Sequence, residues 1–183
     1  MKLEYFNQKS WAEVSREERF FCAELYYQLK KDIKPFLNLI SCDVNKEYDI
    51  GFEVCFYRDV LYEFGMKVRE EKFSEKRTFD LALLAQDEII IIEAKCRQGF
   101  EGMQLGYIKE DKTHIIDELF KKIGKPPVTV RCAAIISSKY SPSTQTKDFF
   151  KEGHKEKIIT WKTLAVIYPN ARELFERADA IYK

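Results

Sequence analysis

Three charged residues in the middle of the chain have the types and spacing of a metal-dependent hydrolytic site. Glu93 and Lys95 are two positions apart at the end of an apolar run, and Asp80 stands alone in an earlier apolar segment. Residues two apart on a β-strand point to the same side, so a carboxylate and an ammonium group would share one small surface. Charges in such surroundings are costly unless they are paired or bind a metal ion. Metal binding linked to catalysis would account for all three.

Two carboxylates offer the hard oxygen ligands that Mg²⁺ prefers, and Mn²⁺ can take its place. Such an ion keeps several waters and completes its coordination with phosphate oxygens of the substrate. It can polarise a phosphodiester and lower the pKa of a bound water. Lys95 could then orient or deprotonate that water and offset the charge that develops on the phosphate. The chemistry expected is Mg²⁺-dependent phosphodiester hydrolysis, with Asp80 and Glu93 as ligands.

The segments that carry these residues predict two strands of one sheet. Residues 77–84 and 88–95 are rich in β-formers and are joined by a short turn, so they should form an antiparallel hairpin that brings Asp80 beside Glu93. Four consecutive isoleucines at 89–92 predict a central strand that is covered on both faces. In the alternative interpretation, Glu93 and Lys95 form a surface ion pair and Asp80 is a charge at the edge of the hairpin.

The rest of the pattern predicts one domain across residues 1–183, of the α/β class, with a central mixed sheet flanked by helices. Further strands are expected at residues 53–60, 128–137 and 157–161. Helices are expected from the Ser15 region to about residue 31, in a turn from Pro35, and at residues 103–123, 162–167 and 171–182. Residues 137–146 predict a surface loop.

Glu18 lies at the start of the first predicted helix and allows two interpretations. Residues 15–18 read S-R-E-E, the form of a capping box in which the Ser15 hydroxyl and the Glu18 carboxylate satisfy free backbone donors. Glu18 also recurs with Cys22 and Leu25 on the helical stripe that should face the core. It could therefore be a capping partner alone, or a carboxylate that faces the site.

The sequence resembles the PD-(D/E)XK, or restriction-endonuclease-like, superfamily of nucleases in two segments. These are residues 78–80, which read T-F-D with Phe79 in place of the motif's proline, and residues 89–95, which read I-I-I-I-E-A-K. The resemblance implies a restriction-endonuclease-like core. It further implies that Asp80, Glu93 and the main-chain carbonyl of Ala94 bind Mg²⁺ and that Lys95 assists the attacking water.

The same resemblance implies two more site residues on helices. The family commonly places a glutamate on its first helix, for which Glu18 is the match and Glu24 the alternative. Many members also carry a glutamine on the helix after the E-x-K strand, and Gln104 stands in that place. In the family a tyrosine usually follows this glutamine by four residues, one helical turn. Here Tyr107 follows Gln104 by three residues.

Charge limits how the chain could hold a polyanion. The 31 basic and 30 acidic residues give a net charge of +1, so a nucleic-acid site must be local. The dense basic segments at residues 109–125 and 147–157 are candidates for phosphate contact or for ordinary solvated faces. Near-neutral charge also suggests that a partner, or a second copy of the chain in a homodimer, supplies part of the grip.

Cysteine usage and hydropathy indicate where the protein works. Five cysteines without a C-x-x-C pair predict reduced thiols in a cytoplasmic protein, and the two histidines are too isolated for a zinc site. No apolar run approaches the roughly 18 residues that span a membrane. We therefore expect a cytoplasmic Mg²⁺-dependent nuclease whose partner is nucleic acid, with DNA the favoured substrate. The alternative is a catalytically inactive nuclease-like domain that serves as a nucleic-acid-binding or assembly module.

Overall fold

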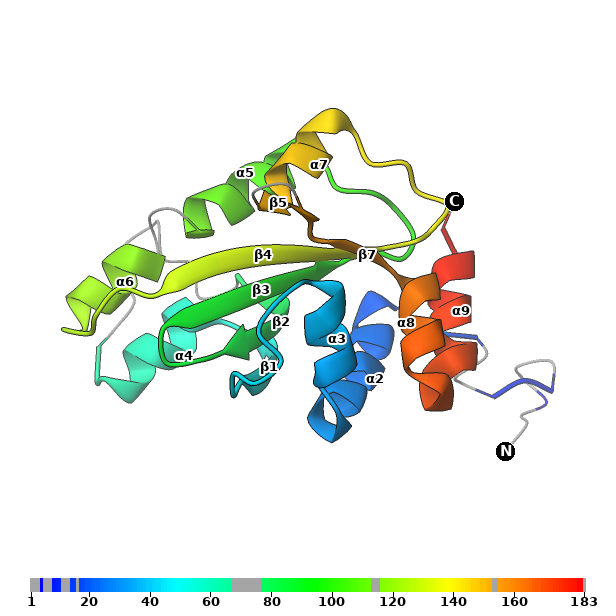
Figure 1. Cartoon of the computed structure of the whole chain (residues 1–183), viewed down its shortest axis with the longest axis horizontal. Coiled ribbons are helices and arrows are strands. Elements are labelled where there is room, and N and C mark those ends of the chain that lie inside the picture. Colours follow the sequence, from blue (N-terminus) through cyan, green and yellow to red (C-terminus); the bar gives the residue numbers. More distant parts are fainter. Residues whose placement is uncertain are drawn as a thin grey trace.

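A mixed β-sheet forms the centre of the fold (Figure 1). The structure, a computed structural model, describes residues 4, 8–10, 14, 15, 17–66, 77–112, 116–152 and 155–182. Within these residues the sheet has five strands in the order β1–β2–β3–β4–β7. The strands are β1 (Asp49–Val54), β2 (Phe79–Leu84), β3 (Glu88–Ala94), β4 (Thr129–Ile136) and β7 (Ile158–Thr160). β1, β2 and β3 are antiparallel neighbours, whereas β3 pairs with β4, and β4 with β7, in parallel.

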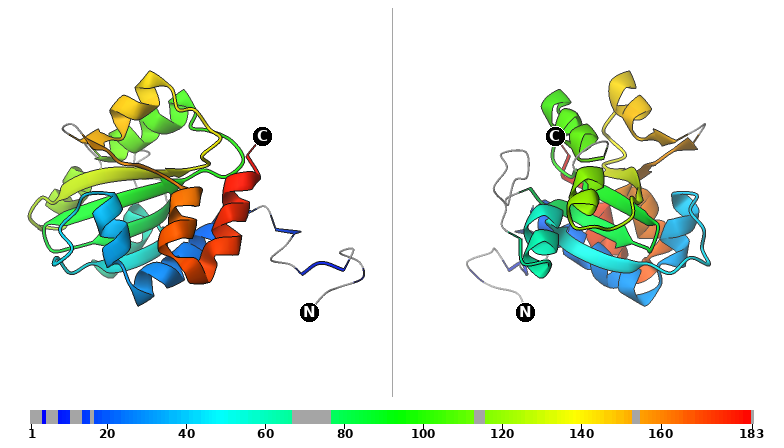
Figure 2. Two further views of the ribbon diagram at one scale, coloured as in Figure 1. Left: turned by 45° about the vertical axis from the view of Figure 1, so that its right-hand side comes forward. Right: turned by 90° about the vertical axis from the view of Figure 1, so that its left-hand side faces the viewer.

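Helices cover both faces of this sheet (Figure 2). On one face lie α2 (Glu18–Lys31), α3 (Lys34–Leu39), α8 (Trp161–Ile167) and α9 (Arg172–Ala180). On the other lie α4 (Phe56–Glu63), α5 (Gly102–Glu110) and α6 (Ile116–Lys122). The chain between β4 and β7 forms α7 (Thr144–Phe149) and a small hairpin of β5 (Lys151–Glu152) and β6 (Lys155–Glu156), and η3 (Pro169–Ala171) joins α8 to α9. The result is the α/β class that the sequence predicted, in three layers.

Strand β3 is the central strand that the isoleucine run predicted. All seven of its residues are buried. Ile90 and Ile92 belong to the core beneath α2 and α8, and Ile89 and Ile91 to the core beneath α5 and α6. Each such side chain contributes roughly 1.5–3 kcal/mol when fully buried. The alternative interpretation, in which Glu93 and Lys95 form a surface ion pair, is therefore wrong, because both faces of β3 are covered.

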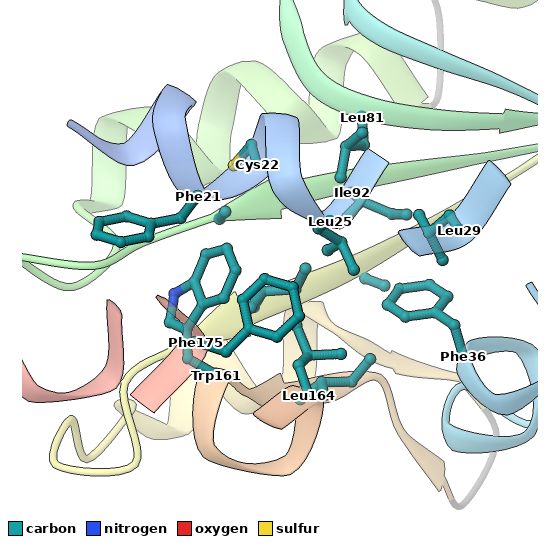
Figure 3. Close-up of a cluster of buried hydrophobic side chains, with 14 of the residues drawn as sticks. Phe21, Cys22, Leu25, Leu29, Phe36, Leu81, Ile92, Trp161, Leu164 and Phe175 are labelled. Carbon is teal, nitrogen blue, oxygen red and sulfur yellow. The ribbon is translucent and has the colours of Figure 1, made fainter. Parts of the chain in front are cut away.

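Aromatic rings fill the core on the α2 face (Figure 3). The ring of Trp161, at the first position of α8, has its centroid 6.2 Å from that of Phe21 on α2 and 5.7 Å from that of Phe175 on α9. All three side chains are fully buried. These contacts hold the C-terminal helices against the first helix and the sheet.

The structure corrects the predicted strand at residues 53–60. β1 begins earlier, at Asp49, and ends at Val54, and helix α4 begins at Phe56. In α4 the buried residues are Phe56, Tyr57 and Leu61, which form one helical face against the second core. Burial of that face outweighs the strand propensity of the aromatic and β-branched residues.

Other predicted bounds need smaller corrections. The predicted loop at 137–146 ends at Ser143, whose side chain accepts a hydrogen bond from the Thr146 N–H and caps α7. Within the predicted helix at 103–123, α5 ends at Glu110, residues 111 and 112 are π-helical and α6 begins at Ile116, while residues 113–115 lie outside the described residues. The predicted strand at 157–161 stops at Thr160, which caps α8. No helix in the described part of the chain has the length and apolar character to cross a bilayer.

Candidate active site

Asp80 and Glu93 occupy opposed positions on β2 and β3. The ladder pairs Leu81 with Ile92, so the next step of the antiparallel register sets Asp80 against Glu93, and opposed residues share one face of the sheet. The ladder ends one step earlier, at Leu81 and Ile92, and the Asp80 Oδ2 atom accepts a hydrogen bond of 2.8 Å from the Ala94 N–H. The side chain of Asp80 thus ties the end of β3 in place of a main-chain bond. This is the arrangement that the predicted hairpin required.

Lys95 lies immediately after β3 and is held between two oxygens. Its Nζ atom is 2.9 Å from Glu18 Oε1 and donates a hydrogen bond of 2.8 Å to the main-chain carbonyl of Ala94. The ring of Phe100 lies on another side, with its centroid 5.6 Å from Nζ. Lys95 is only 8% exposed, so its ammonium group is fixed and largely shielded from solvent.

Glu18 faces this site and does not act as a capping partner. Its Oε2 atom accepts a hydrogen bond of 2.9 Å from the Cys96 N–H, while Oε1 pairs with Lys95. Residue Glu17 is the N-cap of α2, without a side-chain capping bond, and Ser15 Oγ accepts a 3.4 Å hydrogen bond from the Glu17 N–H. The capping-box prediction is therefore wrong, because both Glu18 oxygens are engaged at the end of β3.

The other helix residues predicted for the site have different surroundings. Glu24 accepts a hydrogen bond of 2.7 Å from the Gln28 side chain within α2, so it serves its own helix. Gln104 is half-buried in the first turn of α5, and among the described residues it makes no hydrogen bond to Asp80, Glu93 or Lys95.

Tyr107, half-exposed on α5, lies against a buried polar network. The guanidinium of Arg77 is 4.7 Å from the centroid of its ring. Arg77 also pairs with Asp111 at 2.9 Å, and the Tyr57 hydroxyl donates a hydrogen bond to the same carboxylate. This network fixes the chain three positions before Asp80.

Trp161 is a residue of the site that the sequence did not reveal. Its indole N–H donates a hydrogen bond of 3.1 Å to the main-chain carbonyl of Lys95. The sequence predicted a core anchor here, which is correct, but no local pattern connects it to a residue 66 positions away. The last third of the chain therefore fixes the main chain from which the Lys95 side chain projects.

Burial and mutual repulsion raise the pKa values of the carboxyl groups. Burial raises the pKa of Glu93 well above its ordinary range, and the negative charge of Asp80 adds to the shift. Burial also raises the pKa of Asp80 and of Glu18, although Lys95 opposes the shift in both. For Lys95, burial alone would lower the pKa, but the charge and hydrogen bond of Glu18 and the charges of Asp80 and Glu93 raise it, and the net shift is upward.

Glu53 and Arg19 flank the site on the β1 side. The β1–β2 ladder pairs Phe52 with Leu81 and Val54 with Phe79, which puts Glu53 level with Asp80. Burial and the charge of Asp80 raise the pKa of Glu53, and Arg19 Nε pairs with its carboxylate at 3.2 Å. The backbone of Glu53 has φ +53°, a region that non-glycine residues seldom adopt. Glu53 is thus a paired, half-buried carboxylate beside the site.

The donor set fits a hard divalent cation. The Glu93 side chain is almost fully buried and meets no hydrogen-bond donor among the residues that the structure describes. A buried carboxylate in that state is costly unless a proton or a cation neutralises it. Asp80 and the Ala94 carbonyl supply further oxygen donors at the same strand ends, as Mg²⁺ prefers. The described ranges contain no group of three or more His, Cys, Asp or Glu side chains that could hold a metal ion. The predicted ligand set includes only two such side chains, those of Asp80 and Glu93.

Comparison with protein-family models and with curated proteins found no match to this chain.

Proposed function

We propose that this chain is a Mg²⁺-dependent nuclease that hydrolyses phosphodiester bonds, with DNA as its substrate. One observation carries the proposal: Asp80 and Glu93 are opposed one step beyond the end of the β2–β3 ladder, and Lys95 follows two residues after Glu93. Two acidic groups on one face of the sheet can serve one ion. Two carboxylates at opposed positions in largely buried surroundings are costly unless a proton or a cation neutralises them.

The residues divide into ligands and a positioned cation. Asp80, Glu93 and the Ala94 carbonyl would hold Mg²⁺, which when bound polarises a phosphodiester and acidifies a coordinated water. The carbonyl of Ala94 has two lone pairs, so it can accept from Lys95 and still act as a ligand. Lys95 carries its charge within an ion pair. Its role would be to donate hydrogen bonds to water or phosphate oxygens and to offset negative charge.

Glu18 acts through Lys95 in this proposal. Its carboxylate pairs with the Lys95 ammonium group and accepts a hydrogen bond from the Cys96 N–H. It therefore fixes both the lysine side chain and the main chain beyond it. Positioning of this kind matters because catalytic groups must be held to within a fraction of an ångström.

The resemblance to PD-(D/E)XK nucleases supports the same reading. Phe79 and Asp80 of the T-F-D segment begin β2, and Glu93 and Ala94 of the E-A-K segment end β3, with Lys95 immediately after it. Helices α2 and α3 precede β1, helix α4 separates β1 from the β2–β3 hairpin, and α5, α6 and the parallel strand β4 follow. Gln104 stands in the place of the family's helix glutamine, and a role for it remains part of the proposal.

The decisive experiment compares the parent protein with Asp80→Ala on linear, circular and branched DNA, with and without Mg²⁺. The proposal expects cleavage by the parent only with Mg²⁺ or Mn²⁺, and none by the variant. The pattern of products separates endonucleolytic from exonucleolytic cutting.

Isothermal titration with Mg²⁺ separates the proposal from its rival. DNA binding without metal binding at millimolar Mg²⁺ would instead identify a nuclease-like module that binds nucleic acid without cutting it. Cleavage by Lys95→Ala at the parent's rate, with the fold retained, would remove the lysine from the mechanism.

A further inference from the structure

A groove of about 500 Å³ lies between α5 and α7 and is lined by lysines. We call it the α5–α7 groove. Lys109 and Lys112 line it from the α5 side, and Lys151 lines it from the start of β5. Gln145 and Asp148 of α7 also line it, so the lining formed by described residues contains three lysines and one carboxylate. The two helices stand on the same side of the sheet (Figure 2).

The groove joins the two basic segments that the sequence singled out. Lys109 and Lys112 come from the segment at 109–125, and Lys151 comes from the segment at 147–157. Each segment alone could be an ordinary solvated face. Folding brings lysines from both to one concave surface, in a protein whose net charge of only +1 gives no general attraction for polyanions.

The α5 wall of the groove is smooth enough for close approach. Gly102 and Gly106 are one helical turn apart and both line the groove. A β-carbon added at either position would meet no heavy atom within 4 Å, so both positions border open space. A sugar-phosphate chain could lie against this wall while lysines contact it from the rim.

Three aromatic rings in contact with one another connect the groove to Lys95. The ring of Phe100 lies against the Lys95 ammonium at 5.6 Å, and its centroid is 5.0 Å from that of Phe150. Phe150 in turn packs on Phe149 at 4.9 Å, and Phe149 lines the groove. This chain of ring contacts links the groove to the end of the sheet that carries the candidate site.

We propose that the α5–α7 groove binds the phosphate backbone of duplex DNA next to the bond that is cut. This rests on the proposed function for the choice of DNA as occupant. Lysine ammonium groups neutralise phosphates as point charges and release condensed counterions, which gives binding that is independent of sequence and sensitive to salt. The groove would supply the local grip that the net charge does not.

The test measures binding without cleavage. Fluorescence anisotropy in EDTA would follow a labelled DNA duplex of about 20 base pairs at roughly 0.05–0.3 M KCl. The test variant is K109Q/K112Q/K151Q. The matched control, K31Q/K34Q/K162Q, removes three exposed lysines from helices on the opposite face and changes the net charge equally. Circular dichroism and thermal melting check that both variants are folded.

The groove variant should bind about 10- to 100-fold more weakly near 0.1 M salt, and the slope of log K against log salt should shrink by about 2–3. The control should bind as the parent does. Equal losses in both variants, parent-like binding by the groove variant, or no duplex binding by the parent would each overturn the groove.

Cleavage is scored separately. A groove-dependent slope in a protein that cuts no DNA would leave the groove standing and sink the nuclease proposal. Metal-dependent cleavage by the parent, together with normal DNA binding by the groove variant, would support the nuclease proposal and contradict the role of the groove.

Discussion

Glu18 and Lys95 are 77 positions apart in the chain and form an ion pair of 2.9 Å. The same carboxylate accepts the N–H of Cys96, so the N-terminus of α2 is fixed to the end of β3 by two bonds. The lysine of the candidate site therefore depends on the first described helix for its position.

Glu18→Gln should reduce DNA cleavage by about 10- to 100-fold, because the amide can still accept from the Cys96 N–H but no longer pairs with the ammonium. Lys95→Met should reduce it further, and the double variant should be little worse than Lys95→Met alone, because the two residues act as one unit. The control is Glu24→Gln, which removes a carboxylate that bonds only Gln28 within α2. Single-turnover rates provide the measurement. Equal effects at positions 18 and 24 would contradict the positioning role.

Asp80→Asn tests the ligand role while preserving the shape of the site. The amide oxygen can replace Oδ2 as acceptor of the Ala94 N–H, so the fold should be retained. Loss of the charge should weaken Mg²⁺ binding and slow cleavage by at least about 100-fold, since even outer partners of metal ligands cost up to that amount. Calorimetric titration with Mg²⁺ and a cleavage assay measure the two effects. Unchanged Mg²⁺ affinity would remove Asp80 from the ligand set.

Glu93→Gln should stabilise the metal-free protein at neutral pH. Burial, with the charge of Asp80 added, raises the pKa of Glu93 in the folded state, while the unfolded chain titrates near about 4. Between these two values the unfolded state loses its proton first, so the free energy of unfolding falls as pH rises through that window. The variant lacks this titration. It should be less sensitive to pH and about 1 kcal/mol more stable than the parent near pH 7, as is common when a strained functional group is replaced.

Urea unfolding in EDTA at several pH values between about 4 and 8 measures this difference. The control is Glu173→Gln on the exposed side of α9, which should leave the pH dependence as in the parent. A parent protein whose stability rises across this range in step with the Glu93→Gln variant would show that the buried carboxylate does not control it.

Much of the strand arrangement could be predicted because its signals are local. The isoleucine run predicted a strand buried on both faces, and the two-residue spacing of Glu93 and Lys95 predicted their common direction. The hairpin turn then fixed the register that opposes Asp80 and Glu93. Hydrophobic alternation and turn length act within a few residues, so they can be read without knowing the rest of the fold.

The parts that could not be predicted depend on contacts distant in sequence. Residues 56–63 have strand-forming side chains but form a helix, because the second core covers Phe56, Tyr57 and Leu61 on one face. The choice between two roles for Glu18 depended on where the end of β3 would lie, which no local pattern gives. The bond from Trp161 to Lys95 likewise requires the packed core.

Trp161→Phe should damage both stability and catalysis. It leaves the buried Lys95 carbonyl without its donor, which costs about 1–3 kcal/mol, and it loosens the main chain that bears the lysine. The control is Tyr168→Phe, which removes a hydrogen bond of 3.0 Å from the hydroxyl to the Asp32 carbonyl in the same core. That change should cost about 1 kcal/mol and leave the cleavage rate unaltered. Thermal melts and cleavage rates at matched temperature compare them, and equal loss of activity in both variants would refute a specific role for the indole.

The intrinsic fluorescence of Trp161 can also be used as a probe of the candidate site. Tryptophan emission responds to nearby charge and polarity, and this ring is one hydrogen bond from the main chain of Lys95. The chain's other tryptophan, Trp11, lies outside the described residues, and a W11F background would isolate the signal. Occupancy of the site by an ion or a phosphate could then be followed in real time, without a label and without turnover.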